Sequence, residues 1–64
     1  MEYEAVDVHQ LRERLGTQCS PDPGRSGYVI GPDKNNRLCH VVSCRNMQEA
    51  KRYAENLNKE FGND

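Results

Sequence analysis

The sequence predicts a single small α+β domain spanning residues 1–64. Three observations support this class: helix-spaced apolar residues near the C-terminus, two β-rich runs separated by turn residues, and a helix-start signal near the N-terminus. The expected order is a short helix over about 8–15, a connector over 17–26, an antiparallel β-hairpin over about 27–43 and a long amphipathic helix over about 47–61, packed on the sheet.

The C-terminal helix has the clearest pattern, with apolar residues recurring at spacings of three and four. Residues at these spacings lie on one face of a helix, so they form a single apolar seam. Asn46 is a suitable N-cap and Gly62 a suitable end. The seam, which we expect to serve as core or protein interface, consists of Met47, Ala50, Ala54, Leu57 and Phe61.

The N-terminal helix is predicted from its start signal. Asp7 and Gln10 have the spacing of a capping box, and Gly16 is a natural residue to end the helix. Residues 2–5 are compatible with a third, short strand before this helix, but no clear signal predicts it.

The hairpin is predicted from residues 27–30 and 38–43, which are rich in β-branched and apolar side chains and flank a turn over 31–37. Strict alternation would place four residues of the second strand on one face, namely Leu38, His40, Val42 and Cys44. We expect the long helix to pack across one face of the hairpin, with the short helix beside it.

The composition leaves a thin core, because 34% of the residues are hydrophobic and there is no Trp and one Phe. A chain of this size hides only roughly 60% of its unfolded surface. Such chains usually depend on a disulfide, a metal, a partner or a second copy. A homodimer, in which a second copy adds to the thin core, is therefore one of the predicted possibilities.

No stretch is apolar enough to cross a membrane, and the acidic N-terminus lacks the pattern of a secretion signal. Three cysteines, an odd number, fit reduced thiols better than a disulfide framework. Together these features predict a cytoplasmic protein without membrane contact.

Metal binding and catalysis are both disfavoured, and we expect no cofactor. A zinc site could draw on His9, Cys19, Cys39, His40 and Cys44, but neighbours on a strand face opposite sides, and His40 and Cys44 lie roughly 13 Å apart along it. No nucleotide-binding, metalloprotease or hydrolase motif is present. We therefore assign no catalytic or metal-binding residue and expect no enzyme activity.

Cys44 is the one residue for which the sequence indicates chemical reactivity. It precedes a helix N-terminus and adjoins Arg45, and both features favour a thiolate. Small buried or edge thiols remain the simpler interpretation of the cysteines.

The charge is uneven along the chain, although the net charge is only −1. Residues 25–53 carry six basic against two acidic side chains, and both ends are acidic. A nucleic-acid-binding hairpin is therefore the alternative function. Its candidate contacts are Arg25, Lys34, Arg37, Arg45, Lys51 and Arg52.

A protein-binding role is the preferred prediction, because the seam or an exposed strand edge offers a docking surface. The pattern Gly27-Tyr28-Val29-Ile30, a turn, Leu38 to Val42, then Met47-x-x-Ala50-x-x-Tyr53-Ala54-x-x-Leu57-Asn58 resembles small accessory proteins of bacteriophages and mobile elements, including anti-CRISPR proteins.

This resemblance implies a non-catalytic accessory or inhibitor protein that acts on a larger host protein, and it assigns no functional residue. The order of hairpin and helix also looks like the arm-binding domains of phage integrases, although their usual third strand is not evident in the sequence.

Overall fold

The computed structural model describes residues 2–16 and 23–62 and has the predicted α+β class. The short N-terminal strand left open by the sequence is present, so the hairpin belongs to a three-stranded sheet. The elements, in chain order, are β1 (Glu4–Val6), α1 (Val8–Leu15), β2 (Gly27–Pro32), β3 (Leu38–Cys44), α2 (Met47–Leu57) and the π-helical turn η2 (Asn58–Gly62).

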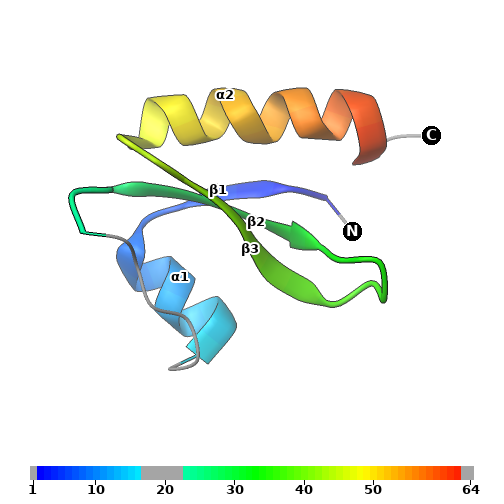
Figure 1. The fold of residues 1–64 in the computed structure, drawn as a ribbon, viewed down its shortest axis with the longest axis horizontal. Helices are drawn as coiled ribbons and strands as arrows, with labels where there is room; N and C mark the ends of the chain where they lie inside the picture. The colour runs from blue at the N-terminus through cyan, green and yellow to red at the C-terminus, as the bar shows by residue number, and fades with distance from the viewer. Residues whose placement is uncertain (1, 17–22, 63–64) are drawn as a thin grey trace.

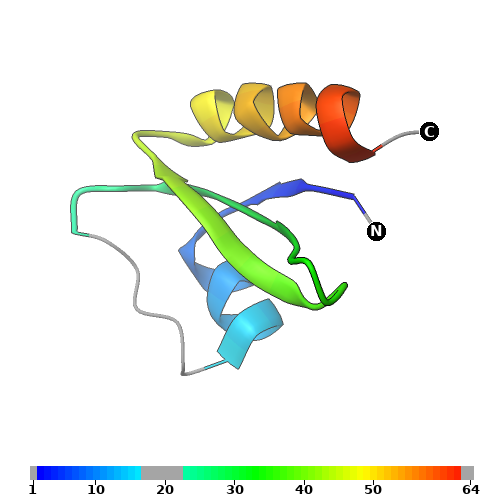
Figure 2. The same ribbon diagram turned by 45° about the vertical axis from the view of Figure 1, so that its right-hand side comes forward.

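The sheet is antiparallel, in the order β1-β2-β3, and lies between the two helices. α1 covers one face and α2 the other (Figures 1 and 2). The expectation that the two helices lie side by side is therefore wrong. The central strand β2 is covered on both faces, which explains why Gly27 to Gly31 are all buried.

Two apolar clusters fill the space on either side of the sheet. Beneath α1 the buried side chains are Val6, Leu11, Tyr28 and Ile30. Beneath α2 they are Val29, Cys44, Ala50 and Ala54. Neighbouring residues of β2 thus alternate between the clusters, as the pleat of a strand requires.

A β-bulge in β3 changes the side-chain alternation predicted for this strand. Val29 pairs with Val42, but the next residue, Ile30, pairs with His40, so Val41 is the extra residue. Val42 and Cys44 pack on the α2 side, whereas Leu38 packs on the α1 side. The prediction that all four even-numbered residues share a face is therefore wrong, because the extra residue shifts the alternation by one.

The helix starts follow the sequence signals. The Asp7 carboxylate accepts a hydrogen bond of 2.8 Å from the Gln10 backbone N–H, and the Gln10 side chain accepts one of 3.2 Å from Asp7. The Asn46 side chain likewise accepts from the Glu49 N–H at 2.8 Å. Gly16 ends α1 with a φ of 75°, a conformation that glycine adopts without strain.

Two glycines of β2 allow neighbouring groups to come close. A Cβ on Gly27 would overlap the backbone carbonyl of Asn46 and lie 3.0 Å from the Ala50 Cβ. A Cβ on Gly31 would overlap the ring of Tyr3. Glycine at these positions therefore lets the start of α2 and the segment before β1 pack directly on the sheet.

The C-terminal helix covers the predicted extent but changes type near its end. The α-helix runs to Leu57, and residues 58–62 continue it as a π-helical turn. Among the described elements η2 packs against α2, and its first residue, Asn58, also hydrogen-bonds to Tyr3 just before β1.

Candidate protein-binding surface

The predicted seam is only partly buried. Ala50 and Ala54 are 0% and 5% exposed against the sheet, and Leu57 packs at the margin of the same cluster. Met47 is half-buried. Phe61 is 67% exposed, because no described strand lies beneath η2. The alanines thus form the close helix–sheet contact, and the largest side chain of the seam stays in water.

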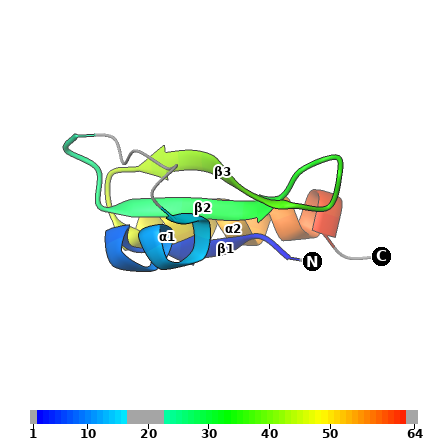
Figure 3. The ribbon, with the colours of Figure 1, turned by 90° about the horizontal axis from the view of Figure 1, so that it is seen from below.

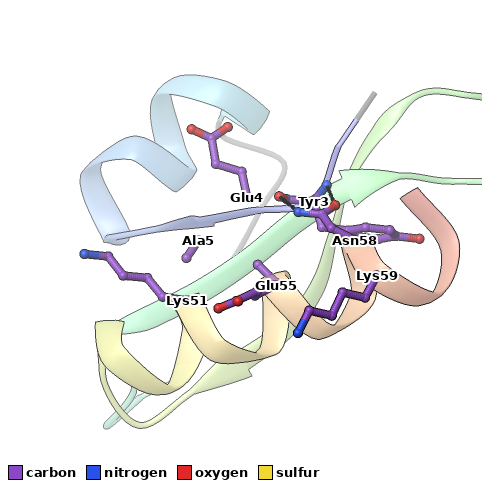
Figure 4. Close-up of a pocket in the computed structure, with 8 residues that line it drawn as sticks. Tyr3, Glu4, Ala5, Lys51, Glu55, Asn58 and Lys59 are labelled. Carbon is purple, nitrogen blue, oxygen red and sulfur yellow. Dashed lines mark hydrogen bonds between the residues drawn. The ribbon is translucent and has the colours of Figure 1, made fainter. Parts of the chain in front are cut away.

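One flank of α2 faces β1, as Figure 4 shows. Asn58 holds this flank to the start of the chain through two hydrogen bonds. Its Oδ1 accepts from the Tyr3 N–H at 2.7 Å, and its Nδ2 donates to the Tyr3 carbonyl at 3.0 Å. We call this paired contact the Asn58 clamp. Its amide satisfies both backbone groups of Tyr3, as a neighbouring strand would do.

A shallow hollow of about 410 Å³ lies beside the Asn58 clamp. Its rim mixes Lys51 and Lys59 with Glu4 and Glu55, so no single sign of charge dominates (Figure 4). No sequence signal predicts the clamp, because an asparagine near a helix end is as well explained by solvent exposure.

The opposite flank of α2 is turned toward the β3 side of the sheet. Residues two apart on a helix lie roughly 200° apart, so Tyr53 and Leu57 point away from the β1-facing Lys51 and Glu55. Tyr53 is 44% exposed. We call this surface the outer flank; it lines a hollow of about 200 Å³ and consists of Tyr53, Asn56, Leu57 and Glu60.

β3 forms the edge of the sheet next to the outer flank. No strand of the described part of the chain pairs with its outer side. Seen from the α1 side, β3 lies to the side of both helices (Figure 3). Val41, the bulge residue, is 39% exposed. Exposed apolar groups therefore occur on the edge strand as well as on α2 and η2.

The six candidate nucleic-acid contacts do not form one group. Lys34 and Arg37 lie at the hairpin turn, whereas Arg25 and Arg45 lie at the other end of the strands, where the Ser26 hydroxyl donates to the Arg45 carbonyl at 2.7 Å. Six residues of β2 separate these ends, a distance of about 20 Å.

The two remaining basic residues lie on α2 and point in different directions. Lys51 borders the hollow beside β1, and Arg52 borders another with Asn46 and Glu49. The basic middle of the sequence is therefore spread over the molecule.

The environment of Cys44 is that of the simpler interpretation, a small buried thiol, and does not favour the thiolate. The residue is 2% exposed, and burial raises the pKa of its thiol, with the negative charge of Glu49 adding to the effect. The charge of Arg25 acts in the other direction but is the smallest of the three influences. The inference of a reactive thiolate is therefore corrected: Cys44 is a small core residue. Cys39 is half-buried, and Cys19 lies outside the described residues.

His40 lies on the α1 side of the sheet because of the bulge. Its Nε2 is 3.1 Å from the Ser43 hydroxyl, and its ring packs edge-on against Tyr28 with centroids 5.8 Å apart. In residues 2–16 and 23–62 no three His, Cys, Asp or Glu side chains gather as metal ligands. None of the helices in these ranges is both long and apolar enough to cross a bilayer.

Comparison with known proteins gives no match to a family model, to a curated protein or to a solved structure. The resemblance to phage accessory proteins therefore stays a prediction. The likeness to integrase arm-binding domains also stays a prediction; the structure shows only that the sheet has a third strand, β1.

Proposed function

We propose that this chain is a non-catalytic protein-binding module that docks a different, larger protein, as an accessory or inhibitor protein would. The supporting observation is the exposure of its large apolar side chains. Tyr53 and Phe61 are 44% and 67% exposed although the core has few large residues. Aromatic side chains are enriched at protein interfaces and often supply much of the binding energy. The docking surface in this proposal comprises the outer flank, Phe61 and the edge strand β3.

A different protein fits this surface better than a second copy. A twofold axis through the middle of β3, at Val41, would pair the two copies of the strand over their full length. Each Arg37 would then lie opposite an Arg45 of the other copy, because each of these residues is four positions from Val41, on opposite sides of it. Like charges directly opposite one another destabilise strand pairing.

Nucleic-acid binding has weaker support. The basic side chains lie at two ends of the hairpin and on two sides of α2, and the net charge is −1. Affinity for a phosphate backbone requires several cations that contact it at once. A gel-shift titration with duplex DNA at low salt tests this alternative; a shift lost in K34A/R37A would favour it over protein binding.

Site-specific photo-crosslinking in the cells in which the protein is naturally made, the native host, tests the proposal. A photoreactive phenylalanine analogue is placed at Tyr53 or Phe61, and at Glu55 on the β1-facing flank as a matched helix control. We expect positions 53 and 61 to crosslink the same host protein and position 55 to crosslink none. Equal crosslinking from all three positions, a crosslink only to a second copy, or no crosslink at 53 and 61 would contradict the proposal.

A further inference from the structure

β3 differs from ordinary edge strands because its sequence offers almost no protection. Natural proteins guard edges with charged side chains, prolines, short strands or bulges. The seven residues Leu38–Cys44 include no Lys, Arg, Asp, Glu or Pro, and only the bulge at Val41 interrupts them. The other edge, β1, is three residues long and carries Glu4, and the Asn58 clamp occupies the backbone just before it. The unguarded side of the sheet is thus the side next to the outer flank.

Basic residues stand at both ends of this uncharged strand. Arg37 immediately precedes it and Arg45 immediately follows it, and both are exposed. Arg25 lies near the Arg45 end, because it comes two residues before Gly27, which pairs with Cys44. Asp33 at the turn offsets part of the charge of Arg37. Its carboxylate accepts a hydrogen bond of 2.9 Å from the Arg37 backbone N–H, which lowers the pKa of that carboxyl, and the positive charge of Arg37 adds to this effect. The edge is therefore apolar in the middle and positive at its ends.

We propose that the open edge of β3 binds an extended, apolar segment of the partner protein that carries acidic residues on both sides. The segment would add a fourth strand, using the backbone groups that face away from β2, as in other cases of strand addition. Its side chains on the α2 side would reach Tyr53 and Leu57 of the outer flank. This inference rests on the proposed protein-binding function and names the kind of segment that is bound.

Two synthetic peptides test the charge pattern. One has the sequence Glu-Glu-Val-Thr-Val-Thr-Val-Glu-Glu, and the other has lysine in place of each glutamate. Binding is followed by peptide fluorescence anisotropy and by amide chemical shifts of the isotope-labelled protein. We expect the acidic peptide to bind about fivefold or more tightly than the lysine peptide, a preference that falls as salt is raised. The amide shifts should concentrate in Leu38–Cys44.

Three variants distinguish the contribution of the strand to peptide binding from that of the charged residues at its ends. R37Q/R45Q should remove the preference for the acidic peptide, whereas K34Q, a matched loss of charge at the hairpin turn, should keep it. Val41→Lys places a charge on the exposed bulge residue and should weaken both peptides about tenfold without lowering the melting temperature. Equal binding of the two peptides, no binding, or amide shifts confined to other elements would overturn the inference.

The crosslinking experiment keeps the two proposals distinguishable. If positions 53 and 61 capture a host protein and neither peptide binds β3, only the strand-addition inference fails. If the peptides bind β3 as expected and no host protein is captured, the edge inference stands and the docking surface on α2 is wrong. A stable dimer in sedimentation experiments, with the β3 amides protected from exchange, would overturn the inference, because the edge would already be filled.

Discussion

Replacing Asn58 by alanine should loosen the first strand from the rest of the molecule. The Asn58 side chain makes both hydrogen bonds of the clamp, at 2.7 and 3.0 Å, and it joins positions 55 residues apart in the sequence. The variant leaves the N–H and the carbonyl of the half-buried Tyr3 without these partners. We expect Asn58→Ala to destabilise the fold while leaving its helical content nearly unchanged.

The magnitude follows from the two lost bonds. Each intramolecular hydrogen bond contributes about 0.5–1.5 kcal/mol net, so the clamp contributes about 2 kcal/mol. A chain of 64 residues is expected to have a free energy of unfolding of about 3–10 kcal/mol. For a domain of this size 1 kcal/mol corresponds to about 4–8 °C in melting temperature. The predicted decrease is therefore about 8–16 °C.

Asn56→Ala is the matched control, because it makes the same substitution two residues earlier, at an exposed position of α2. Both variants replace asparagine by the better helix former alanine, so the difference between them isolates the clamp. Thermal unfolding followed by circular dichroism gives the stability, and amide exchange of residues 3–6 gives the local effect. If Asn58→Ala melts within about 2 °C of Asn56→Ala, or if exchange in β1 is unchanged, the clamp does not hold the strand.

Three further predictions concern stability and thiol chemistry. Gly27→Ala should cost more than the 1–3 kcal/mol typical of an overpacked core, because its Cβ would overlap the Asn46 backbone; chemical denaturation measures this, and a loss below about 1 kcal/mol would contradict the packing. Hydrogen bonds from the Arg37 and Asn35 backbone N–H groups lower the pKa of Asp33 below 3.8, so the charged carboxylate stabilises the turn above that pH. The advantage of the wild type over Asp33→Asn should therefore shrink as pH falls below about 4, and a constant difference in melting temperature from pH 7 to pH 2 would refute this. In a variant that retains only Cys44, the buried thiol should react with Ellman's reagent far more slowly than free cysteine, whereas fast reaction at pH 7 would show that the site is open.

The sequence predicted those parts of the fold whose signals are local. Asp7 with Gln10 and Asn46 with Glu49 mark helix starts through hydrogen bonds within one turn, and the structure contains them. The hairpin follows from turn residues as well. Asp33 accepts from two backbone N–H groups, and Asn36 has a φ of 61°, a conformation that asparagine tolerates.

The features that the sequence did not predict depend on contacts between distant residues. The bulge at Val41 inserts one residue between otherwise regular pairs, and nothing in a run of Leu, Cys, His and Val indicates where it falls. It moved His40 to the α1 side, and the strand pattern alone could not show this. The position of α1 on the opposite face was equally hidden, since both faces of β2 are apolar.

The same long-range arrangement decides which part of the predicted seam is available for binding. Ala50 and Ala54 are small enough to bring α2 close to β2, and the Asn58 clamp draws the C-terminal end of the helix toward the β1 edge. Because the helix is held on that side, β3 lies beside it and Tyr53 stays 44% exposed. The clamp and the candidate docking surface are therefore coupled: loosening α2 from β1 should alter the hollow of the outer flank. In the crosslinking experiment Asn58→Ala should then reduce capture from position 53 at temperatures where the variant remains folded.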